Sequence, residues 1–427
     1  MIPVSSSFPD AGGDLSLSAT RTRIADLLGG LGTPVPGIET VALDQALDRI
    51  AADEVLAPID VPPWDNSAMD GYAFDSACLG GGATVRLRVL GRALAGRPWS
   101  GVATPDGAVR IMTGAAMPAG CDSVVPQEGV KVEADGCIVF DATRLRPGAN
   151  RRRAGDDWRR ATPVLRAGAR LRPAEVGVLA SLGIERVAVR QRLRVAVFST
   201  GDELRRQGEP LVSGAIYDSN RFTLAAMLRR LGAEPIDLGI VPDEPDALRR
   251  VLAEAARVAD AVITSGGVSA GDADHVRAAV AEHGQIDFWK LAFRPGRPFA
   301  CGHLCRADGQ PVPFFGLPGN PAAVIATFYC LVRDALLHAM GALPAPLPHV
   351  PARAETALGK RPGRTEVLRG LARRDASGNW QVASAGSQSS GTLHAMLSAN
   401  CLIVLSSESG PIAAGDTVDV VFFEGLI

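Results

Sequence analysis

Three glycine-containing segments combine residue types that suit the binding of a phosphate. They are residues 199–203 (Ser-Thr-Gly-Asp-Glu), 265–274 (Ser-Gly-Gly-Val-Ser-Ala-Gly-Asp-Ala-Asp) and 316–321 (Gly-Leu-Pro-Gly-Asn-Pro). Glycine lets the backbone approach a phosphate closely, and N–H groups at a helix start point toward it. A single loop of this kind is more often a tight strand-to-helix turn. Three loops at one sheet edge favour a binding site, although none is a Walker A or GxGxxG motif.

Carboxylates accompany these segments. Glu203, Asp243 and Asp274 fall at or just after the ends of predicted strands. Carboxylates beside a phosphate site call for a cation, and Mg²⁺ binds few carboxylates while bridging to phosphate oxygens. The alternative for each is capping of the next helix, and it is strongest for Asp243. The pattern predicts a magnesium site.

A cluster of cations follows within one strand and one turn, at Lys290, Arg294 and Arg297. Lysine is rare in this chain, at only three positions, whereas nearly every other basic residue is arginine. Lysine at position 290 therefore indicates that this position requires a compact ammonium group and not a planar guanidinium. Chance retention of a lysine is the alternative.

The residue types alone do not decide whether two polar segments nearer the N-terminus are structural or functional. Residues 64–73 follow a rigid proline-rich passage, so a structural turn and a functional loop are equally reasonable. Residues 151–160 mix arginines with aspartates, and a solvated face with internal ion pairs accounts for them as well as a site does.

The elements that position the three loops lie between residues 194 and 341, where apolar runs alternate with amphipathic segments. This alternation predicts a largely parallel sheet covered on both faces, with ligands bound beyond the carboxyl ends of its strands. The predicted strands are 194–198, 236–241, 261–264 and 313–317, and the predicted helices are 219–231, 245–258, 274–283 and 321–340.

The remaining chain divides into further domains. Helices are predicted at 20–28, 42–53 and 173–182, and residues 84–139 are typical of β-structure. The C-terminal part is typical of a small β-barrel or sandwich. The predicted domains are a flexible tail (1–18), a discontinuous helical linker domain (19–58 and 147–190), a β-rich insert (59–146), an α/β domain (191–343) and a C-terminal β domain (344–427).

Composition excludes several classes of partner. The 44 basic and 46 acidic residues give a net charge of −2, which provides no field for nucleic acid or an acidic membrane. No stretch approaches the roughly 20 apolar residues of a membrane span, and the N-terminus lacks signal-peptide character. The 7 scattered cysteines do not form a disulfide framework, so we expect a cytoplasmic protein.

Six segments together resemble the molybdopterin molybdenumtransferase (MoeA, gephyrin E-domain) family. They are residues 66–73, 110–115, 199–204, 265–269, 289–292 and 316–321, in that order. The resemblance runs from about residue 20 to the C-terminus. It implies a molybdopterin-binding α/β domain, a helical linker domain with a β insert, a C-terminal β domain, and a homodimer whose active site lies between subunits.

The resemblance also implies a reaction in which adenylyl-molybdopterin and molybdate give molybdenum cofactor and AMP with Mg²⁺. An adenylyltransferase would act upstream, and proteins that mature molybdoenzymes would act downstream. The implied catalytic residues are Asp70, Asp157, Glu203, Asp274 and Lys290, and the implied metal ligands are Glu203, Asp243 and Asp274. The implied substrate-binding residues are Thr113, Thr200, Gly201, Ser265, Gly266, Gly267, Arg294, Arg297, Pro318, Gly319, Asn320, Pro321, Arg364 and Ser387.

The chain departs from the family pattern in places. Arg294 and Arg297 stand where many members have lysine, and the stretch from Ser387 matches the family pattern only loosely. A catalytically degenerate carrier or a scaffold protein is the alternative function.

Overall fold

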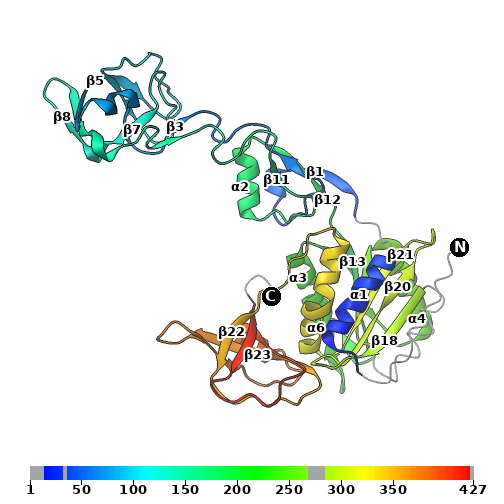
Figure 1. Cartoon of the computed structure of the whole chain (residues 1–427). Coiled ribbons are helices and arrows are strands. Elements are labelled where there is room, and N and C mark those ends of the chain that lie inside the picture. The colour runs from blue at the N-terminus through cyan, green and yellow to red at the C-terminus, as the bar shows by residue number, and fades with distance from the viewer. Residues whose placement is uncertain (1–13, 32–35, 268–283, 424–427) are drawn as a thin grey trace.

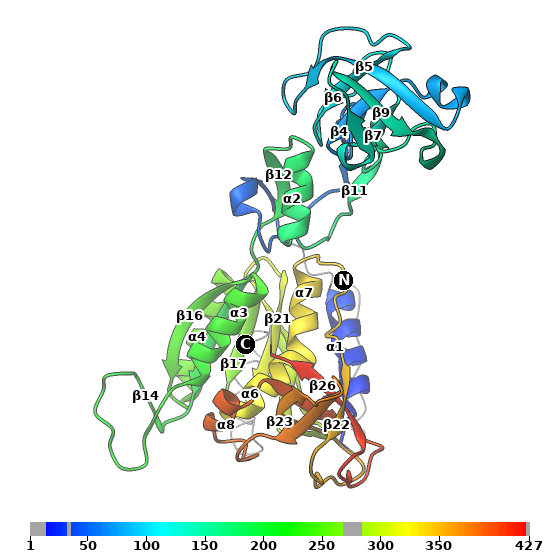
Figure 2. The ribbon, with the colours of Figure 1, turned by 90° about the vertical axis from the view of Figure 1, so that its left-hand side faces the viewer.

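The protein is elongated, with two bodies at one end and one at the other (Figure 1). The structure is a computed structural model and describes residues 14–31, 36–267 and 284–423. An α/β domain and a C-terminal barrel lie together, a small linker region follows, and a β insert forms the far end. Figure 2 shows the same order from the side.

The β insert is a six-stranded sheet with the order β7-β4-β6-β5-β9-β8. Its core contains Phe74, Ile138 and Phe140, which project from alternating positions of the strands. The sequence prediction of β-structure over residues 84–139 is confirmed. The elements are β4 (Gly71–Phe74), η2 (Ser76–Gly81), β5 (Thr84–Ala93), β6 (Gly107–Ile111), β7 (Ser123–Pro126), η3 (Gln127–Gly129), β8 (Val130–Val132), β9 (Cys137–Asp141) and η4 (Ala142–Arg144).

The linker region is built from short paired strands as well as a helix. β1 (Ile38–Ala42) pairs with β12 (Arg186–Arg190), β2 (Val55–Leu56) with β11 (Pro163–Leu165), and β3 (Asn66–Ser67) with β10 (Arg151–Arg152). The helix predicted at 173–182 is confirmed as α2 (Pro173–Ser181).

The prediction of a helix over residues 42–53 is wrong. Only a short 3₁₀ turn, η1 (Leu43–Gln45), forms there. Asp48 adopts a left-handed backbone with φ 62°, which ends any helix, and Ile50 and Ala51 form β-bridges to distant residues. Tertiary pairing therefore overrides the local helical pattern.

The α/β domain has a six-stranded sheet with the order β16-β13-β17-β21-β20-β18. The first four strands are parallel, as predicted, but β20 runs antiparallel to both of its neighbours. The connections before β20 (residues 291–297) and after it (residues 306–310) are short and contain no crossover helix. β20 therefore runs in the opposite direction to the strands on either side. The strands are β13 (Arg194–Thr200), β16 (Glu234–Val241), β17 (Ala261–Ser265), β18 (Gly284–Lys290), β20 (Pro298–Cys305) and β21 (Pro311–Leu317).

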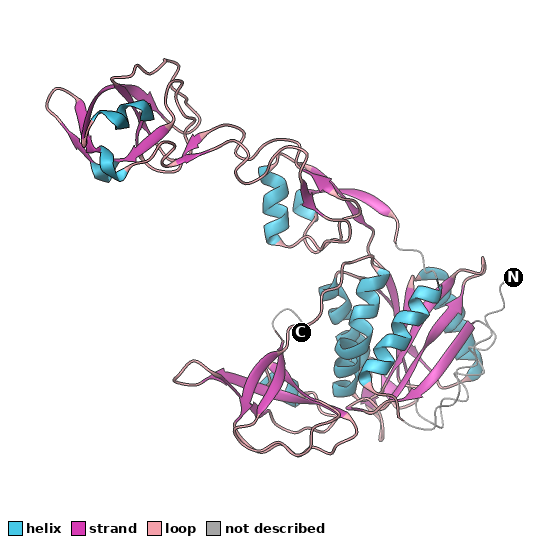
Figure 3. Ribbon diagram, in the orientation of Figure 1, coloured by secondary structure: helices cyan, strands magenta, loops and turns pink. Residues whose placement is uncertain are grey.

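Helices cover both faces of this sheet (Figure 3). Val195 and Val197 pack in the core with α1 (Leu17–Leu31), α3 (Asn220–Leu231) and the run α6 (Pro321–Thr327), η5 (Phe328–Val332) and α7 (Arg333–Ala339). Ala196 and Phe198 point to the other face, toward α4 (Pro245–Val258). The predicted helix at 274–283 lies outside the described residues.

Two expectations at the N-terminal side need correction. Residues 14–18 do not belong to a flexible tail, because the Leu15 N–H donates to the Lys290 carbonyl at 2.8 Å and α1 begins at Leu17. The helix α1 was expected in the linker domain, but its buried Ile24 and Leu28 belong to the α/β core. The apolar face of α1 is therefore buried against the α/β domain.

Pro321–Ala339 is long and apolar enough to cross a membrane by length and composition, which corrects the expectation that no stretch of the chain would be. However, 89% of this stretch is buried inside the protein, as in the core helix of a folded domain. It is the one such helix within the described ranges.

The C-terminal domain is a closed five-stranded barrel, in agreement with the predicted β domain. β23 pairs with both β24 and β25, which closes the order β23-β24-β22-β26-β25. A two-residue strand of the preceding domain, β19 (Phe293–Arg294), pairs in parallel with β23 and attaches the barrel to the α/β domain. The elements are β22 (Val350–Ala354), β23 (Thr365–Arg374), β24 (Trp380–Ser384), α8 (His394–Ser398), β25 (Cys401–Leu405) and β26 (Thr417–Phe422).

Candidate functional site

The three predicted loops meet at one edge of the parallel sheet. Ser199 of β13 is in register with Ser265 of β17, and Ser265 is in register with Leu317 of β21. The loops after these residues therefore leave the sheet side by side, as expected for a ligand site in such a sheet.

The contacts between the loops are close. A Cβ added to Gly266, which has φ +92°, would lie 2.5 Å from the Thr200 carbonyl oxygen. A Cβ on Gly319 would lie 3.9 Å from the Gly266 Cα. Glycine at 266 is thus required both by its backbone conformation and by the approach of the first loop.

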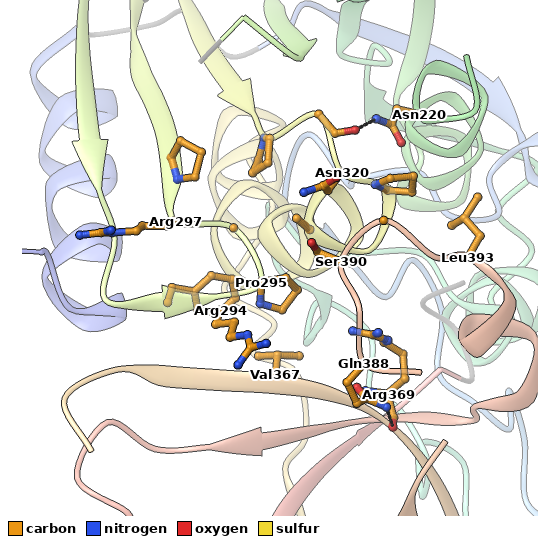
Figure 4. A pocket seen from close by; sticks show the side chains of 18 of the residues that line it. Asn220, Arg294, Pro295, Arg297, Asn320, Val367, Arg369, Gln388, Ser390 and Leu393 are labelled. Atoms are coloured by element: carbon orange, nitrogen blue, oxygen red, sulfur yellow. Dashed lines mark hydrogen bonds between the residues drawn. The ribbon is translucent and has the colours of Figure 1, made fainter. Parts of the chain in front are cut away.

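A cavity of about 1330 Å³ opens where the loops meet the barrel (Figure 4). Its walls come from the three loops, the turn between β19 and β20, the start of α3, and the barrel strand β23. Ten of the predicted site residues line it: Thr200, Glu203, Ser265, Arg294, Arg297, Pro318, Gly319, Asn320, Pro321 and Arg364.

Other lining residues were missed by sequence reasoning. They are mainly Asp218 and Asn220 near the start of α3, and Arg369, Gln388 and Ser390 of the barrel domain. The signal was weak for the barrel, where the family resemblance is loose. Asp218 and Asn220 lie outside the three glycine-containing loops, and only the fold brings them to the cavity.

Two polar atoms at the junction of the loops are buried without a hydrogen-bond partner in the described part of the chain. They are Thr200 Oγ1 and Asn220 Oδ1. Buried polar atoms are nearly always hydrogen-bonded, so such atoms are typical of strained or ligand-binding places. Both belong to residues that line the cavity.

The charges in the cavity are largely paired. Four arginines and four carboxylates line it. Arg297 makes a two-point contact with Asp14, at 3.1 and 3.0 Å, which raises the pKa of the guanidinium. The buried Glu366 lies 3.0 Å from Arg364 and 3.8 Å from Arg294.

Arg369 differs from the other three arginines, because it has no carboxylate partner among residues 14–31, 36–267 and 284–423. Only 2% of its surface is exposed, and its Nη2 donates to the carbonyls of Ser387 and Ser389 at 2.7 and 2.9 Å. Its Nε has no partner among these residues. Burial, and then the nearby Arg294 charge, lower the pKa of Arg369. A bound anion would offset both effects, because a nearby negative charge stabilises the charged guanidinium.

The proposed metal ligands are only partly in view. Glu203 lines the cavity, and the Asp243 N–H donates to Asp202 Oδ1 at 3.3 Å, so the end of β16 lies beside the first loop. Asp274 lies outside the described residues. Within those residues, no group of three His, Cys, Asp or Glu side chains is arranged to hold a metal ion.

Four predicted residues lie near the cavity but not among its lining residues: Gly201, Gly266, Gly267 and Ser387. Gly201 and the two other glycines belong to the loops themselves, and Ser387 contributes its carbonyl to Arg369. Lys290 ends β18 with an exposed side chain, and it too is not a lining residue.

The remaining predicted residues form a second cluster in and beside the β insert. Asp70 Oδ1 accepts hydrogen bonds from the Thr113 N–H and hydroxyl, both at 2.7 Å. These bonds, with the smaller effect of Arg110, lower the pKa of Asp70. Asp157 pairs with Arg152 at 2.7 Å, close to the ribbon of β3 and β10 that enters the insert.

This second cluster, which we call the insert cluster (Asp70, Thr113 and Asp157), lies far from the cavity within one chain. In Figure 1 the linker region separates the insert from the α/β domain. One chain therefore carries two groups of candidate residues that do not meet.

Comparison with known proteins identifies the family. Residues 15–183 match the MoeA N-terminal region (domain I and II), residues 196–338 a probable molybdopterin binding domain, and residues 351–423 the MoeA C-terminal region (domain IV). The chain is 42% identical to the molybdopterin molybdenumtransferase of Haemophilus influenzae over 97% of its own length and 100% of that protein. A Nostoc protein of the same name is 42% identical over 70% of this chain and 68% of its own.

The fold agrees with this result. The crystal structure of the molybdopterin biosynthesis MoeA protein from Pyrococcus horikoshii OT3 superposes with a TM-score of 0.78 and 26% identity, over 96% of this chain and 100% of that one. On sequence and fold together, this chain belongs to the molybdopterin molybdenumtransferase family.

Proposed function

We propose that this protein inserts molybdenum into adenylyl-molybdopterin, with molybdate as the metal source, and releases AMP and molybdenum cofactor. The observation that carries this proposal is the convergence of three glycine-containing loops on one cavity that also contains the buried Arg369. The loops suit the phosphates of an adenylylated substrate, and the arginine suits an oxyanion.

The backbone would contribute most of the phosphate binding. N–H groups of Gly266, Gly267 and Gly319 lie in loops that directly follow strands, where small residues permit close approach. Arg294 and Arg297 would neutralise phosphate charge from the opposite wall. Lys290 stays a candidate for the same task through its position before this turn.

Glu203 and Asp243, together with Asp274, would hold a magnesium ion. Their carboxylate oxygens are the ligands that Mg²⁺ prefers, and the contact between Asp202 and Asp243 supports a meeting of the two strand ends. When bound, the ion would neutralise the charge that develops on the phosphates.

We further propose that the insert cluster of a second copy completes the site. Asp70 and Asp157 lie in and beside the insert, which the linker region separates from the α/β domain of the same chain (Figure 1). A two-fold homodimer would bring the insert of one subunit to the cavity of the other.

The seven free cysteines are compatible with a reducing cytoplasm, where we expect the protein to act.

The test combines binding and turnover. Adenylyl-molybdopterin and Mg²⁺ are supplied with and without molybdate, and AMP release is measured for the wild type and for Arg369→Lys. The variant keeps the charge but loses the planar fork, so we expect roughly tenfold weaker molybdate-dependent release.

Arg144→Lys is the matched control, because Arg144 is exposed in the β insert, away from the cavity. It should behave as the wild type, and a thermal melt of each variant reports folding. Molybdate-independent AMP release, or none, would reject the transferase. Binding of the substrate without release would indicate the carrier function instead.

A further inference from the structure

Asn220 joins two of the three loops. Its Nδ2 donates to Ser265 Oγ at 2.8 Å and to the Gly319 carbonyl at 2.6 Å. Ser265 Oγ in turn donates to the Pro318 carbonyl at 3.2 Å. One side-chain amide therefore connects the second loop to the third, and Figure 4 shows Asn220 facing the segment that carries Asn320.

The segment that carries Asn220 also contacts the end of β13, which leads into the first loop. Two residues earlier, Asp218 is 1% exposed, accepts from Ser199 Oγ at 3.2 Å, and pairs with Arg221 at 3.0 Å. Ser199 is the strand residue that precedes the first loop. The segment 218–221 thus touches the end of β13 on one side and the other two loops on the other.

The amide is not used by its own helix. Asn220 is the first residue of α3, and the N-cap residue Ser219 makes no side-chain cap bond. Both bonds of Asn220 run to residues 45 and 99 positions away in the sequence. The carboxamide nitrogen of asparagine supplies two donors, whereas the similarly sized Asp supplies none and Ser supplies one.

We propose that Asn220 is a positioning residue that sets the spacing between the second and third loops. The loops approach each other through Gly266 and Gly319, which have no side chains to hold them apart or together. Without a tie, each glycine loop would sample many conformations, and its N–H groups would not be preorganised. This inference rests on the proposed phosphate site.

A double-mutant cycle tests whether Asn220 and Ser265 act through one connection between the loops. Asn220→Ala, Ser265→Ala and the double variant are compared for AMP binding by isothermal titration and for AMP release. If the two residues act through one connection, each single variant loses about tenfold in affinity and in kcat/KM, and the double variant loses little more. Losses that multiply would overturn the inference.

Asn379→Ala is the matched control, because Asn379 is exposed in a turn of the barrel, away from the cavity. It should keep wild-type binding and turnover. If Asn220→Ala does not fold, Asn220→Ser, which suits a helix N-terminus, is measured in its place.

The wild type separates the two proposals. A wild type that neither binds AMP nor releases it would reject the proposed function. A wild type that is active, beside an Asn220 variant with unchanged binding and turnover, would reject only the role of Asn220.

Discussion

The cavity and the insert cluster are held together in different ways. In the cavity, loops from three strands and the start of α3 are cross-connected, and most arginines already have carboxylate partners. In the insert cluster, Asp70 is held by one threonine and Asp157 by one arginine. The first is a pocket with its own walls, whereas the second lies on an open surface of the insert, which the proposed dimer would cover with the cavity of a second copy.

The largest effect should come from combining the two regions in one dimer. Asp70→Asn and Glu203→Gln should each lower AMP release by about a hundredfold, because each removes one half of the proposed shared site. Co-expressed, the two variants should recover about a quarter of the wild-type activity, since half of the dimers carry one intact site of two.

The check is the activity of the co-expressed mixture and of differently tagged, co-purified heterodimers, and the purified heterodimers should reach about half of the wild-type activity because one of their two sites is intact. Purified homodimers of each variant serve as controls and should stay inactive. If the heterodimers are also inactive, or if the protein is a monomer in solution, then the insert of a second copy does not complete the site.

The carboxyl group of Asp70 gives a pH test of the insert cluster. Thr113→Val removes the hydroxyl donor but keeps the backbone donor, so the pKa of Asp70 should rise toward its ordinary value. The acid limb of the activity profile should move to higher pH. Carboxyl NMR titration measures the pKa directly.

The linked stability effect has a defined sign. Because the folded pKa of Asp70 lies below the ordinary value of 3.8, its stabilisation is present above that value. It is lost as the pH falls through the lowered folded pKa, and Thr113→Val should lose less between the two. A variant with an unchanged Asp70 titration would contradict this account.

A matched control lies in the same domain. Asp141 Oδ1 accepts from the Thr143 N–H at 2.9 Å and from its hydroxyl at 2.6 Å, and these bonds also lower its pKa. Thr143→Val should therefore raise the pKa of Asp141 in the same way. Activity should not change, because Asp141 lies outside both groups of candidate residues.

The smallest expected effect concerns the pairing inside the cavity. Asp14 occupies Arg297, so an anionic ligand must compete with a carboxylate of the same chain. Asp14→Asn should tighten molybdate binding by roughly two- to fivefold at low salt and by less at high salt, since both side chains are partly exposed.

Isothermal titration of molybdate at two salt concentrations measures this effect. Glu254→Gln is the control, because Glu254 makes a similar two-point pair with Arg257 on α4, at 2.8 and 2.7 Å. Weaker binding by Asp14→Asn would show that Asp14 orients Arg297 for the ligand and does not compete with it.

The sequence predicted the α/β domain well because its signals are local. Each strand is a short apolar run and each loop follows a strand, so the parallel topology alone brings Thr200, Ser265 and Gly319 together. The barrel was predicted as a class of fold only.

What the sequence did not predict depends on distant contacts. The segment 42–53 has a helical pattern, but β-bridges to residues beyond 168 decide its structure. Asn220 and Arg369 became candidates only through neighbours that lie 45 or more residues away or in another domain. No local pattern marks an amide that will connect two loops.

The attachment of the barrel has a consequence for protein engineering. The strand β19, which carries Arg294, is paired with β23 of the barrel although it belongs in sequence to the α/β domain. A chimera cut in the stretch 341–349 would therefore separate one ladder partner from the other. A graft of the barrel from a relative should carry residues 293–298 with it, because the unit that can be exchanged is larger than the continuous C-terminal segment.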